Sequence, residues 1–300
     1  MQNYLGIDWG GTYIKSGLVT ENNKILKKLV YSSLELQKKE VFIDTLYNLT
    51  KEFKNIKAVG IGAPGIIDVK KGFIYYLPNI EGWKNYPLKE KLEKKTKIPV
   101  YIDNDANVFA LAESRVGAAK DVDFAIFLTL GTGLGGAVLV NKKILKNMTS
   151  AAELGHIPIS LEEKKCNCGG SGCIETFIGA KYLILRYKEL TKKDVKEVKE
   201  IFISAQKKEK EALFVWEEFG SILGKFLAGM VNIFNPQKIV LGGGVAGALK
   251  IFKPYLWQAL KKQVMWPNLG GLKIVKAKLK NAGIIGAAIL AKESIKEVGV

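Results

Sequence analysis

The alternation of apolar and polar residues predicts strands that pair through glycine-rich turns. Near the N-terminus, YLGIDWGGTYIKSGLVTENNKIL has the pattern of a strand, a glycine-rich turn, a second strand and a polar turn at Glu21 to Asn23. About 120 residues later, FAIFLTLGTGLGGAVLVNKKIL repeats the same order of features. Two such hairpins predict a fold built by duplication, with two α/β domains that face one another across a cleft.

Helices are expected between and after the two hairpins. Their ranges are 35–54 and 87–96 in the first half, then 105–117, 175–190, 194–206, 209–234 and 282–297. Two further apolar runs, AVGIGAPGIID at 58–68 and KIPVYIDND at 97–105, are expected strands that complete the first domain. Helices alternating with strands in this way predict an α/β fold.

Composition places the chain among ordinary globular proteins. It has 300 residues, of which 48% are apolar and 25% charged, which is long enough for two domains with substantial cores. The first residues lack a basic segment followed by an apolar run, so no signal peptide is expected. The longest apolar stretches, near 125–140 and 282–291, are short or interrupted, so we expect no membrane span and a cytoplasmic protein.

The net charge of +17 raises the question of a nucleic-acid partner. Among the 46 basic residues only Arg115 and Arg186 are arginines, and many of the lysines are interleaved with glutamate. Specific base recognition favours the planar arginine side chain. We therefore expect a solvated lysine-rich surface and no nucleic-acid partner, although such a surface concentrates anionic nucleotides.

Three glycine-rich loops are candidates for binding phosphates. In DWGGTYIK, Asp8 ends a strand and is followed by Gly10, Gly11, Thr12 and Lys15. Successive backbone N–H groups in such a turn form an anion site, although a single glycine-rich hairpin is commonly only a turn.

The second loop, TLGTGLGG, contains Gly131, Thr132 and Gly133 in the matching hairpin, so two loops could hold a triphosphate from both sides. The third, KIVLGGGVAG, runs from a strand through Gly243 and Gly244 towards a helix, which would let adenosine approach the backbone. None of the three matches the GxxxxGK[ST] motif, so a different nucleotide-binding fold is required.

The segment IDNDAN supplies a candidate catalytic base. Phosphoryl transfer to an alcohol needs a carboxylate that accepts the hydroxyl proton. Asp105 follows the expected strand and begins an expected helix, where it could lie at the cleft. Helix capping by Asp103, Asn104 or Asp105 is the alternative, and Asp103 is the favoured cap. Further polar groups that suit a sugar's hydroxyls are Asn79, Glu153 and Glu175.

The only histidine and all three cysteines lie within one short segment. His156, Cys166, Cys168 and Cys173 have the spacing Hx9CxCx4C, and glycines in CNCGGSGC let the loop fold around an ion. Three thiolates and one imidazole are ligands for structural zinc. A disulfide is the alternative, but the number of cysteines is odd. The pattern therefore predicts structural Zn²⁺ that braces Glu153 and Glu175.

Together these residues resemble the ROK family (repressors, uncharacterised proteins and sugar kinases), and within it the glucokinases. The resemblance extends over nearly the whole chain, from GIDWGGTYIK through GAPG, LPNIEGW, IDNDAN, TLGTGLGG, AELGH and CNCGGSGCIE to VLGGGVAG. It implies an actin/hexokinase-like (ribonuclease H-like) duplicated fold with a central cleft. The implied domains are a small one at 1–104, completed by the helix at 285–300, and a large one at 105–284 with the nucleotide and zinc sites.

The resemblance also implies roles for individual residues. Asp105 would be the catalytic base, and Asp8 would help to hold ATP with Mg²⁺. The phosphates would contact Gly10, Gly11, Thr12, Lys15, Gly131, Thr132 and Gly133, and the adenosine would contact Gly243 and Gly244. The sugar would contact Gly65, Asn79, Asn104, Asp105, Glu153, His156 and Glu175.

The expected function is transfer of the ATP γ-phosphate to the 6-hydroxyl of a hexose, with glucose favoured. N-acetylmannosamine, N-acetylglucosamine, fructose and mannose remain alternative acceptors, and polyphosphate remains an alternative donor. A sugar-responsive repressor is the rival class, but only five residues precede Gly6, so no preceding helix-turn-helix domain is expected. The resemblance also implies a homodimer or homotetramer.

Overall fold

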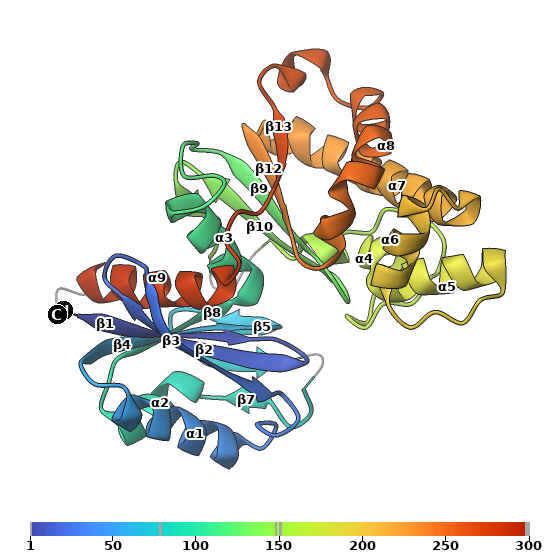
Figure 1. Cartoon of the computed structure of the whole chain (residues 1–300). Helices are drawn as coiled ribbons and strands as arrows, with labels where there is room; N and C mark the ends of the chain where they lie inside the picture. The colour runs from blue at the N-terminus through green and yellow to red at the C-terminus, as the bar shows by residue number, and fades with distance from the viewer. Residues whose placement is uncertain (1, 78–79, 148, 150–151, 298–300) are drawn as a thin grey trace. The chain divides into compact units, whose positions relative to one another are not determined.

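A computed structural model describes residues 2–77, 80–147, 149 and 152–297. The chain forms two compact units (Figure 1). Unit 1 comprises Met1–Asp121, Ile144–Ala152 and Lys278–Val300, and unit 2 comprises Val122–Lys143 and Glu153–Ala277. Each unit is an α/β structure with its own five-stranded sheet, as the repeated hairpin pattern predicts.

The sheet of unit 1 has the strand order β3-β2-β1-β4-β8. The first three strands are antiparallel, and β4 and β8 continue the sheet in parallel with β1. One hydrophobic cluster contains residues of the sheet and of helices α1 and α2, with Trp9 stacked on Phe42 and both rings in contact with Trp83. The bounds are β1 Asn3–Trp9, β2 Tyr13–Thr20, β3 Ile25–Ser32, α1 Lys39–Glu52, β4 Ile56–Ala63, α2 Leu88–Thr96 and β8 Val100–Asn104.

Helix α9 (Ala282–Glu297) packs on the same sheet through glycines that allow close backbone approach. A Cβ atom at Gly6 or Gly60 would collide with the carbonyl groups of Ile284 or Ala287. Helix α3 (Asp105–Arg115) lies against α9, and a Cβ at Gly286 would collide with the carbonyl of Val108. Glycines in β1 and β4 thus allow α9, near the C-terminus, to pack directly on β1, near the N-terminus.

A small second sheet completes unit 1. It consists of β5 (Ile66–Asp68), β6 (Phe73–Tyr76) and β7 (Lys84–Tyr86), in that order. Gly65, which separates β4 from β5, has a φ of +88°, a backbone conformation that favours glycine. The single strand expected at 58–68 is therefore two strands divided by a glycine turn.

The sheet of unit 2 has the order β11-β10-β9-β12-β13, which repeats the topology of unit 1. Strands β9 and β10 form the second hairpin, and β12 and β13 extend the sheet in parallel with β9. The strands are β9 Ala125–Leu130, β10 Leu134–Val140, β11 Lys143–Ile144, β12 Lys238–Gly242 and β13 Lys273–Lys276. The duplication expected from the two hairpins is confirmed at the level of strand order.

Unit 2 also contains long helices, of which α7 and α8 pack closely on one another (Figure 1). The buried rings of Trp216, Phe219 and Phe252 meet at their interface. The bounds are α4 Glu175–Ile178, α5 Ala180–Thr191, α6 Val198–Gln206, α7 Lys210–Phe234 and α8 Leu249–Lys261, with short 3₁₀ helices η1 Leu154–His156, η2 Val245–Ala248 and η3 Trp266–Leu269.

Two expected helices differ from the structure. The helix expected at 175–190 is divided at Gly179, whose extended ψ of 159° ends α4 and begins α5. The helix expected at 194–206 begins only at Val198, because the Glu200 carboxylate accepts hydrogen bonds from the backbone N–H groups of Lys196 and Glu197. Both differences are local effects of turn and capping residues.

The division into units also differs from the expected boundary between residues 104 and 105. Helix α3 lies in unit 1, where it packs against α9. Its fully buried Glu113 carboxylate accepts hydrogen bonds from the backbone N–H groups of Ala118, Lys278 and Leu279. These contacts join α3 to the returning segment that leads into α9.

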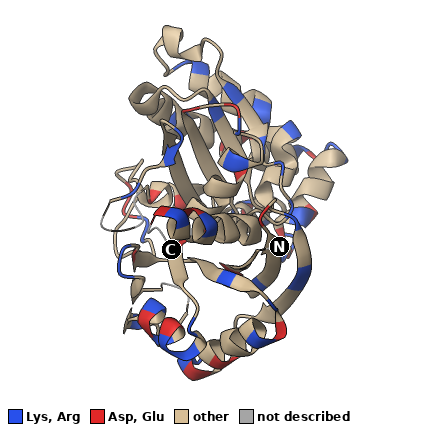
Figure 2. Ribbon diagram, turned by 90° about the vertical axis from the view of Figure 1, so that its left-hand side faces the viewer, with Lys and Arg blue, Asp and Glu red and all other residues tan. Residues whose placement is uncertain are grey.

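Charged residues occur throughout the chain (Figure 2). Lysines and acidic residues alternate on the exposed helices, as the sequence pattern predicts. Within the described residues, none of the helices has the length and apolar character needed to cross a bilayer.

Candidate functional site

The turn between β1 and β2 holds the first group of predicted residues. The Gly10 N–H donates to the carbonyl of Tyr13, and the Ser33 hydroxyl donates to the Gly10 carbonyl at 2.7 Å. Gly11 and Thr12 are exposed at the tip of this turn. Because the base of the turn is fixed while its tip is open to solvent, backbone N–H groups remain where an anion can approach.

Asp8 and Lys15 are opposite residues of this hairpin. The Lys15 Nζ atom lies 3.6 Å from the Asp8 carboxylate. Burial raises the pKa of Asp8, and the charge of Lys15 opposes that rise. Asp8 also lies against α9, because a Cβ at Gly283 would meet its carboxylate.

Asp105 is the first residue of α3, directly after β8. The N-cap of this helix is Asn104, whose side-chain oxygen accepts a hydrogen bond from the Ala106 N–H at 2.8 Å. The expectation that Asp103 caps the helix is wrong, because its carboxylate instead accepts from the Asn107 amide and pairs with Lys146.

The pKa of Asp105 is raised to about 6, first by burial and then by the nearby negative charge of Asp8. The N–H of Ala106 donates to the Asp105 carboxylate and opposes the rise. A carboxylate that gains and loses its proton near neutral pH has the property required of a general base.

Two of the predicted sugar contacts lie together in unit 1. The Asn104 side-chain amide donates to the carbonyl of Gly65 at 3.4 Å, so the start of α3 and the turn after β4 are adjacent. Gly65, Asn104, Asp105 and Asp8 all lie at the carboxyl ends of β1, β4 and β8. Ligands of α/β sheets commonly bind at this edge. Asn79 lies outside the described residues.

The hairpin turn of unit 2 contacts Glu175 directly. The Glu175 carboxylate accepts a hydrogen bond from the Leu134 N–H at 2.8 Å, and a Cβ at Gly133 would collide with that carboxylate. The Gly131 carbonyl accepts from the Ala180 N–H at the start of α5. The structure thus brings the predicted phosphate loop and the predicted sugar ligand Glu175 together.

A cavity of about 600 Å³ lies in unit 2 beside this turn. Three predicted nucleotide contacts, Gly131, Thr132 and Gly244, are part of its lining. The other two predicted in this unit, Gly133 and Gly243, are not in the lining. Gly243 has a structural reason to be glycine in its φ of +81° and its contact with the Leu130 backbone. The volume is in the range of pockets that hold cofactors and drug-sized ligands.

Packing within the described chain does not require glycine at the three glycine positions that line this cavity. A Cβ at Gly131, Gly244 or Gly247 would meet no described atom within 4 Å, and none of the three has a positive φ. Glycine at such positions keeps the backbone accessible to a ligand. The cavity wall is therefore suited to close contact with a bound molecule.

Sequence reasoning missed a second group of residues that line the cavity. They belong to α5, α6, the segment between these helices and α7, and their apolar members include Ile184, Phe202 and Trp216. The charged members are Lys196, Glu197 and Lys199. No motif marks these residues, because ordinary helix periodicity accounts for their pattern in the sequence.

The four predicted zinc ligands come together in unit 2. Their donor atoms all lie within 4.8 Å of one another. The three cysteines are not joined by a disulfide in the structure. Backbone pairing of Ile159 with Gly172 and of Ile157 with Ile174 closes the loop that carries the cysteines.

The spacing of these donor atoms fits a tetrahedral zinc ion. Two sulfurs at 2.3 Å from a zinc ion are about 3.8 Å apart, and a sulfur and an imidazole nitrogen are about 3.5 Å apart. The Sγ atoms of Cys168 and Cys173 are 3.7 Å apart, and the Cys166 Sγ lies 3.5 Å from the His156 Nδ1. The residues therefore fit the ion that the sequence predicts.

The same backbone pairing positions two carboxylates. Glu153 precedes the 3₁₀ turn η1 that ends at His156, and Glu175 begins α4 after Cys173. The His156 N–H donates to the Glu153 carbonyl, and the Cys173 thiol donates to the His156 carbonyl. The loop thus ties both carboxylate-bearing segments to the ligand cluster.

Comparison with known proteins identifies the family. The sequence matches the ROK family over residues 4–294. This chain belongs to the ROK family. It is 34% identical over 309 residues to a glucokinase of Thermotoga maritima, and the alignment covers 97% of this chain and 98% of that protein. The crystal structure of a ROK family glucokinase from Streptomyces griseus, in complex with glucose and AMPPNP, superposes with a TM-score of 0.83 at 30% identity, covering 97% of this chain and 99% of that one.

The family also includes transcriptional regulators. The chain is 29% identical over 303 residues to a xylose repressor of Caldicellulosiruptor bescii, covering 94% of this chain and 75% of the repressor. The actin-like α/β fold expected from the sequence is confirmed by the S. griseus glucokinase and by a ROK hexokinase from Thermus thermophilus, which superposes with a TM-score of 0.84 at 30% identity and covers 99% of this chain and 100% of that one. Because kinases and repressors of this family share the fold, only the residues of the site can indicate which function this chain has.

Proposed function

We propose that this ROK protein is an ATP-dependent hexose kinase that phosphorylates the 6-hydroxyl of glucose. The observation that carries the proposal is Asp105, a partly buried carboxyl group at the start of α3 whose pKa is raised to about 6. The similarity to glucokinases of T. maritima and S. griseus supports the same function. A base of this kind suits proton removal from an alcohol at neutral pH.

In the proposed mechanism, Asp105 accepts the proton of the sugar hydroxyl and orients its oxygen for in-line attack on the γ-phosphate. Gly65 and Asn104, which lie beside Asp105, would contact the sugar, together with Asn79 and the Glu153, His156 and Glu175 side chains of unit 2. Each buried sugar hydroxyl needs a polar partner, which amides and carboxylates supply.

The donor would occupy the cavity of unit 2. Gly131, Thr132 and Gly244 would contact ATP there, with Gly133 and Gly243 shaping the two loops. Gly10, Gly11, Thr12 and Lys15 of the first hairpin would contact phosphate oxygens, and Asp8 would hold the Mg²⁺ that neutralises negative charge on the phosphates. The apolar wall formed by Ile184, Phe202 and Trp216 suits a purine.

Zinc would have a structural role. All four ligand positions would be taken by His156, Cys166, Cys168 and Cys173, so no position would remain open for a reacting water. Its proposed contribution is to hold the segments that carry Glu153 and Glu175. The homodimer or homotetramer implied by the resemblance stays a prediction.

A coupled assay with a panel of hexoses and donors tests the function. We expect ATP-dependent phosphorylation with the highest kcat/KM for glucose, among glucose, mannose, fructose, N-acetylglucosamine and N-acetylmannosamine. Asp105→Asn should retain glucose binding, measured by calorimetry, and lose about a hundredfold to ten-thousandfold in kcat, the usual cost of removing a general base. Turnover within tenfold of wild type would refute the assignment of Asp105.

A sugar-responsive repressor is the second candidate, favoured by the 29% identity to the xylose repressor. A repressor would bind sugar and a specific DNA site without hydrolysing or transferring phosphate from ATP. Sequence-specific, sugar-sensitive binding to DNA together with no kinase activity on the whole panel would establish it. Polyphosphate in the donor panel tests the remaining alternative donor.

A further inference from the structure

The charged residues of the unit 2 cavity come from one short segment of the described chain. Lys196, Glu197 and Lys199 line the cavity at the start of α6, whereas the other described lining residues are uncharged. This stretch therefore carries a net positive charge of one. Because it lines the same cavity as the open glycines Gly131 and Gly244, this segment is a candidate for recognising the charge of the donor.

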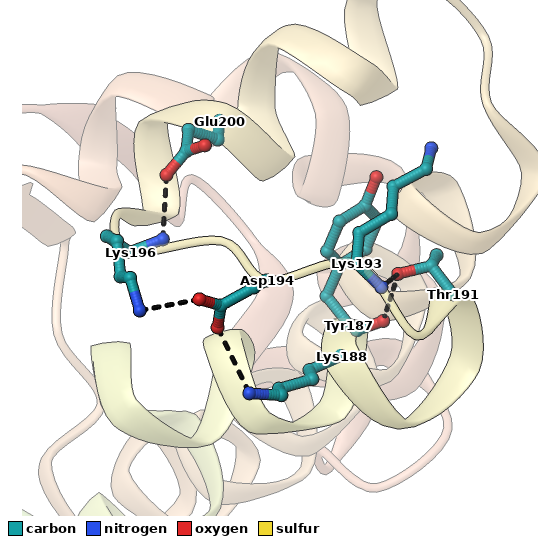
Figure 3. A network of polar contacts seen from close by, with 7 residues as sticks. All are labelled: Tyr187, Lys188, Thr191, Lys193, Asp194, Lys196 and Glu200. Atoms are coloured by element: carbon teal, nitrogen blue, oxygen red, sulfur yellow. Dashed lines mark hydrogen bonds and ion pairs between the residues drawn. The ribbon is translucent and has the colours of Figure 1, made fainter.

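The ammonium group of Lys196 forms an exposed ion pair with Asp194, and breaking this pair costs little free energy. The Lys196 Nζ atom lies 2.6 Å from an Asp194 carboxylate oxygen, and the other oxygen of Asp194 lies 3.0 Å from the Lys188 Nζ (Figure 3). The side chains of Lys196 and Asp194 are 78% and 56% exposed. Ion pairs this exposed contribute little, and Lys188 would still neutralise Asp194 after Lys196 moved.

The backbone of the same segment is held in place independently of that ion pair. The Glu200 carboxylate accepts hydrogen bonds from the Lys196 N–H at 2.8 Å and from the Glu197 N–H at 2.9 Å (Figure 3). The backbone of Lys196 is thus fixed at the start of α6 while its side chain reaches a carboxylate that two lysines share. A fixed backbone with an exchangeable side-chain contact is suited to ligand recognition.

We propose that Lys196 contributes to donor recognition by exchanging Asp194 for an anionic oxygen of a nucleoside polyphosphate bound in the cavity. This inference rests on the proposed ATP-dependent function. The apolar residues Ile184 and Phe202 would receive the base, and Lys196 would distinguish a charged nucleotide from a nucleoside. A linear polyphosphate would leave the apolar part of the cavity unfilled.

Calorimetric titration of the whole protein with ADP, adenosine and tripolyphosphate tests this role. Lys196→Met should weaken ADP binding about three- to fivefold, the value of one exposed ionic contact, and leave adenosine binding unchanged. Lys193→Met is the matched control, because Lys193 is an exposed lysine three residues away that pairs with Glu209 and does not line the cavity. It should bind ADP as wild type does.

Asp194→Asn gives an independent readout. Removing the competing carboxylate should tighten ADP binding about twofold and leave adenosine binding unchanged. Equal effects of Lys196→Met on ADP and adenosine, or equal effects of Lys196→Met and Lys193→Met on ADP, would overturn the role of Lys196. A wild-type protein that binds tripolyphosphate but neither ADP nor ATP would overturn the proposed donor itself, which is a separate result.

Discussion

Replacing Asp105 by asparagine is expected to stabilise the protein at neutral pH while it removes most of the turnover. The pKa of Asp105 is about 6 in the folded protein against an ordinary value of 3.8. At 1.36 kcal/mol for each pKa unit, keeping this carboxylate ionised in the folded state costs about 2–3 kcal/mol. Asparagine retains the oxygen that accepts from the Ala106 N–H at 2.8 Å, so the helix start should survive the change.

The pH dependence of this gain follows from proton binding. Between about pH 4 and pH 6 the folded protein keeps the Asp105 proton and the unfolded chain loses it, so the contribution of Asp105 to the free energy of unfolding falls as pH rises. The advantage of Asp105→Asn should therefore be near zero at pH 4 and reach about 2–3 kcal/mol above pH 6.5.

Urea unfolding of both proteins at several pH values measures this difference. Asp194→Asn is a control of opposite sign, because hydrogen bonds from Lys196 and Lys188 lower the pKa of Asp194. The stability that Asp194 contributes is lost only as pH falls below its ordinary pKa, so that variant should gain nothing at neutral pH. An Asp105→Asn protein whose stability relative to wild type does not change with pH would refute the reasoning.

Four further outcomes are expected. The kcat/KM of wild type should decline as pH falls below about 6, because protonated Asp105 cannot accept the sugar proton; a flat profile from pH 5 to 8 would exclude it as the base. Metal analysis should give about one zinc per chain, and Cys168→Ser should lower both zinc content and Tm; a zinc-free protein with full activity would contradict the site. Gly60→Ala should destabilise by more than about 2 kcal/mol in urea unfolding, since its Cβ would collide with the Ala287 carbonyl of α9, whereas Gly11→Ala, with no described atom within 4 Å, should unfold as wild type does. Gly133→Ala should raise the KM for glucose several-fold by displacing the Glu175 carboxylate, and an unchanged KM would separate Glu175 from sugar binding.

Features set by local sequence were predictable. Glycine turns between apolar runs determine both hairpins, because a tight turn places its two flanking strands side by side and antiparallel. The repeat of this hairpin pattern along the chain therefore predicts the duplicated strand order of the two sheets. The zinc ligands were equally visible, since the chain contains one histidine and three cysteines and all lie between His156 and Cys173. Three cysteines and one histidine clustered in this way are typical of a structural zinc site.

Features that depend on distant parts of the chain required the tertiary structure. Helix α3 belongs to unit 1 because Glu113 binds the backbone of Lys278 and Leu279, a contact between residues about 165 positions apart that no local pattern records. The cavity residues Ile184, Lys196 and Phe202 were likewise not predicted, since the sequence pattern around them is that of ordinary helices, and the cavity forms only when α6 packs against α5 and η2. The sequence by itself determined the turns, the repeat and the metal ligands, because these depend on neighbouring residues. Tertiary packing decided which glycines contact a helix and which line a cavity, and it raised the pKa of Asp105 by burying it near Asp8.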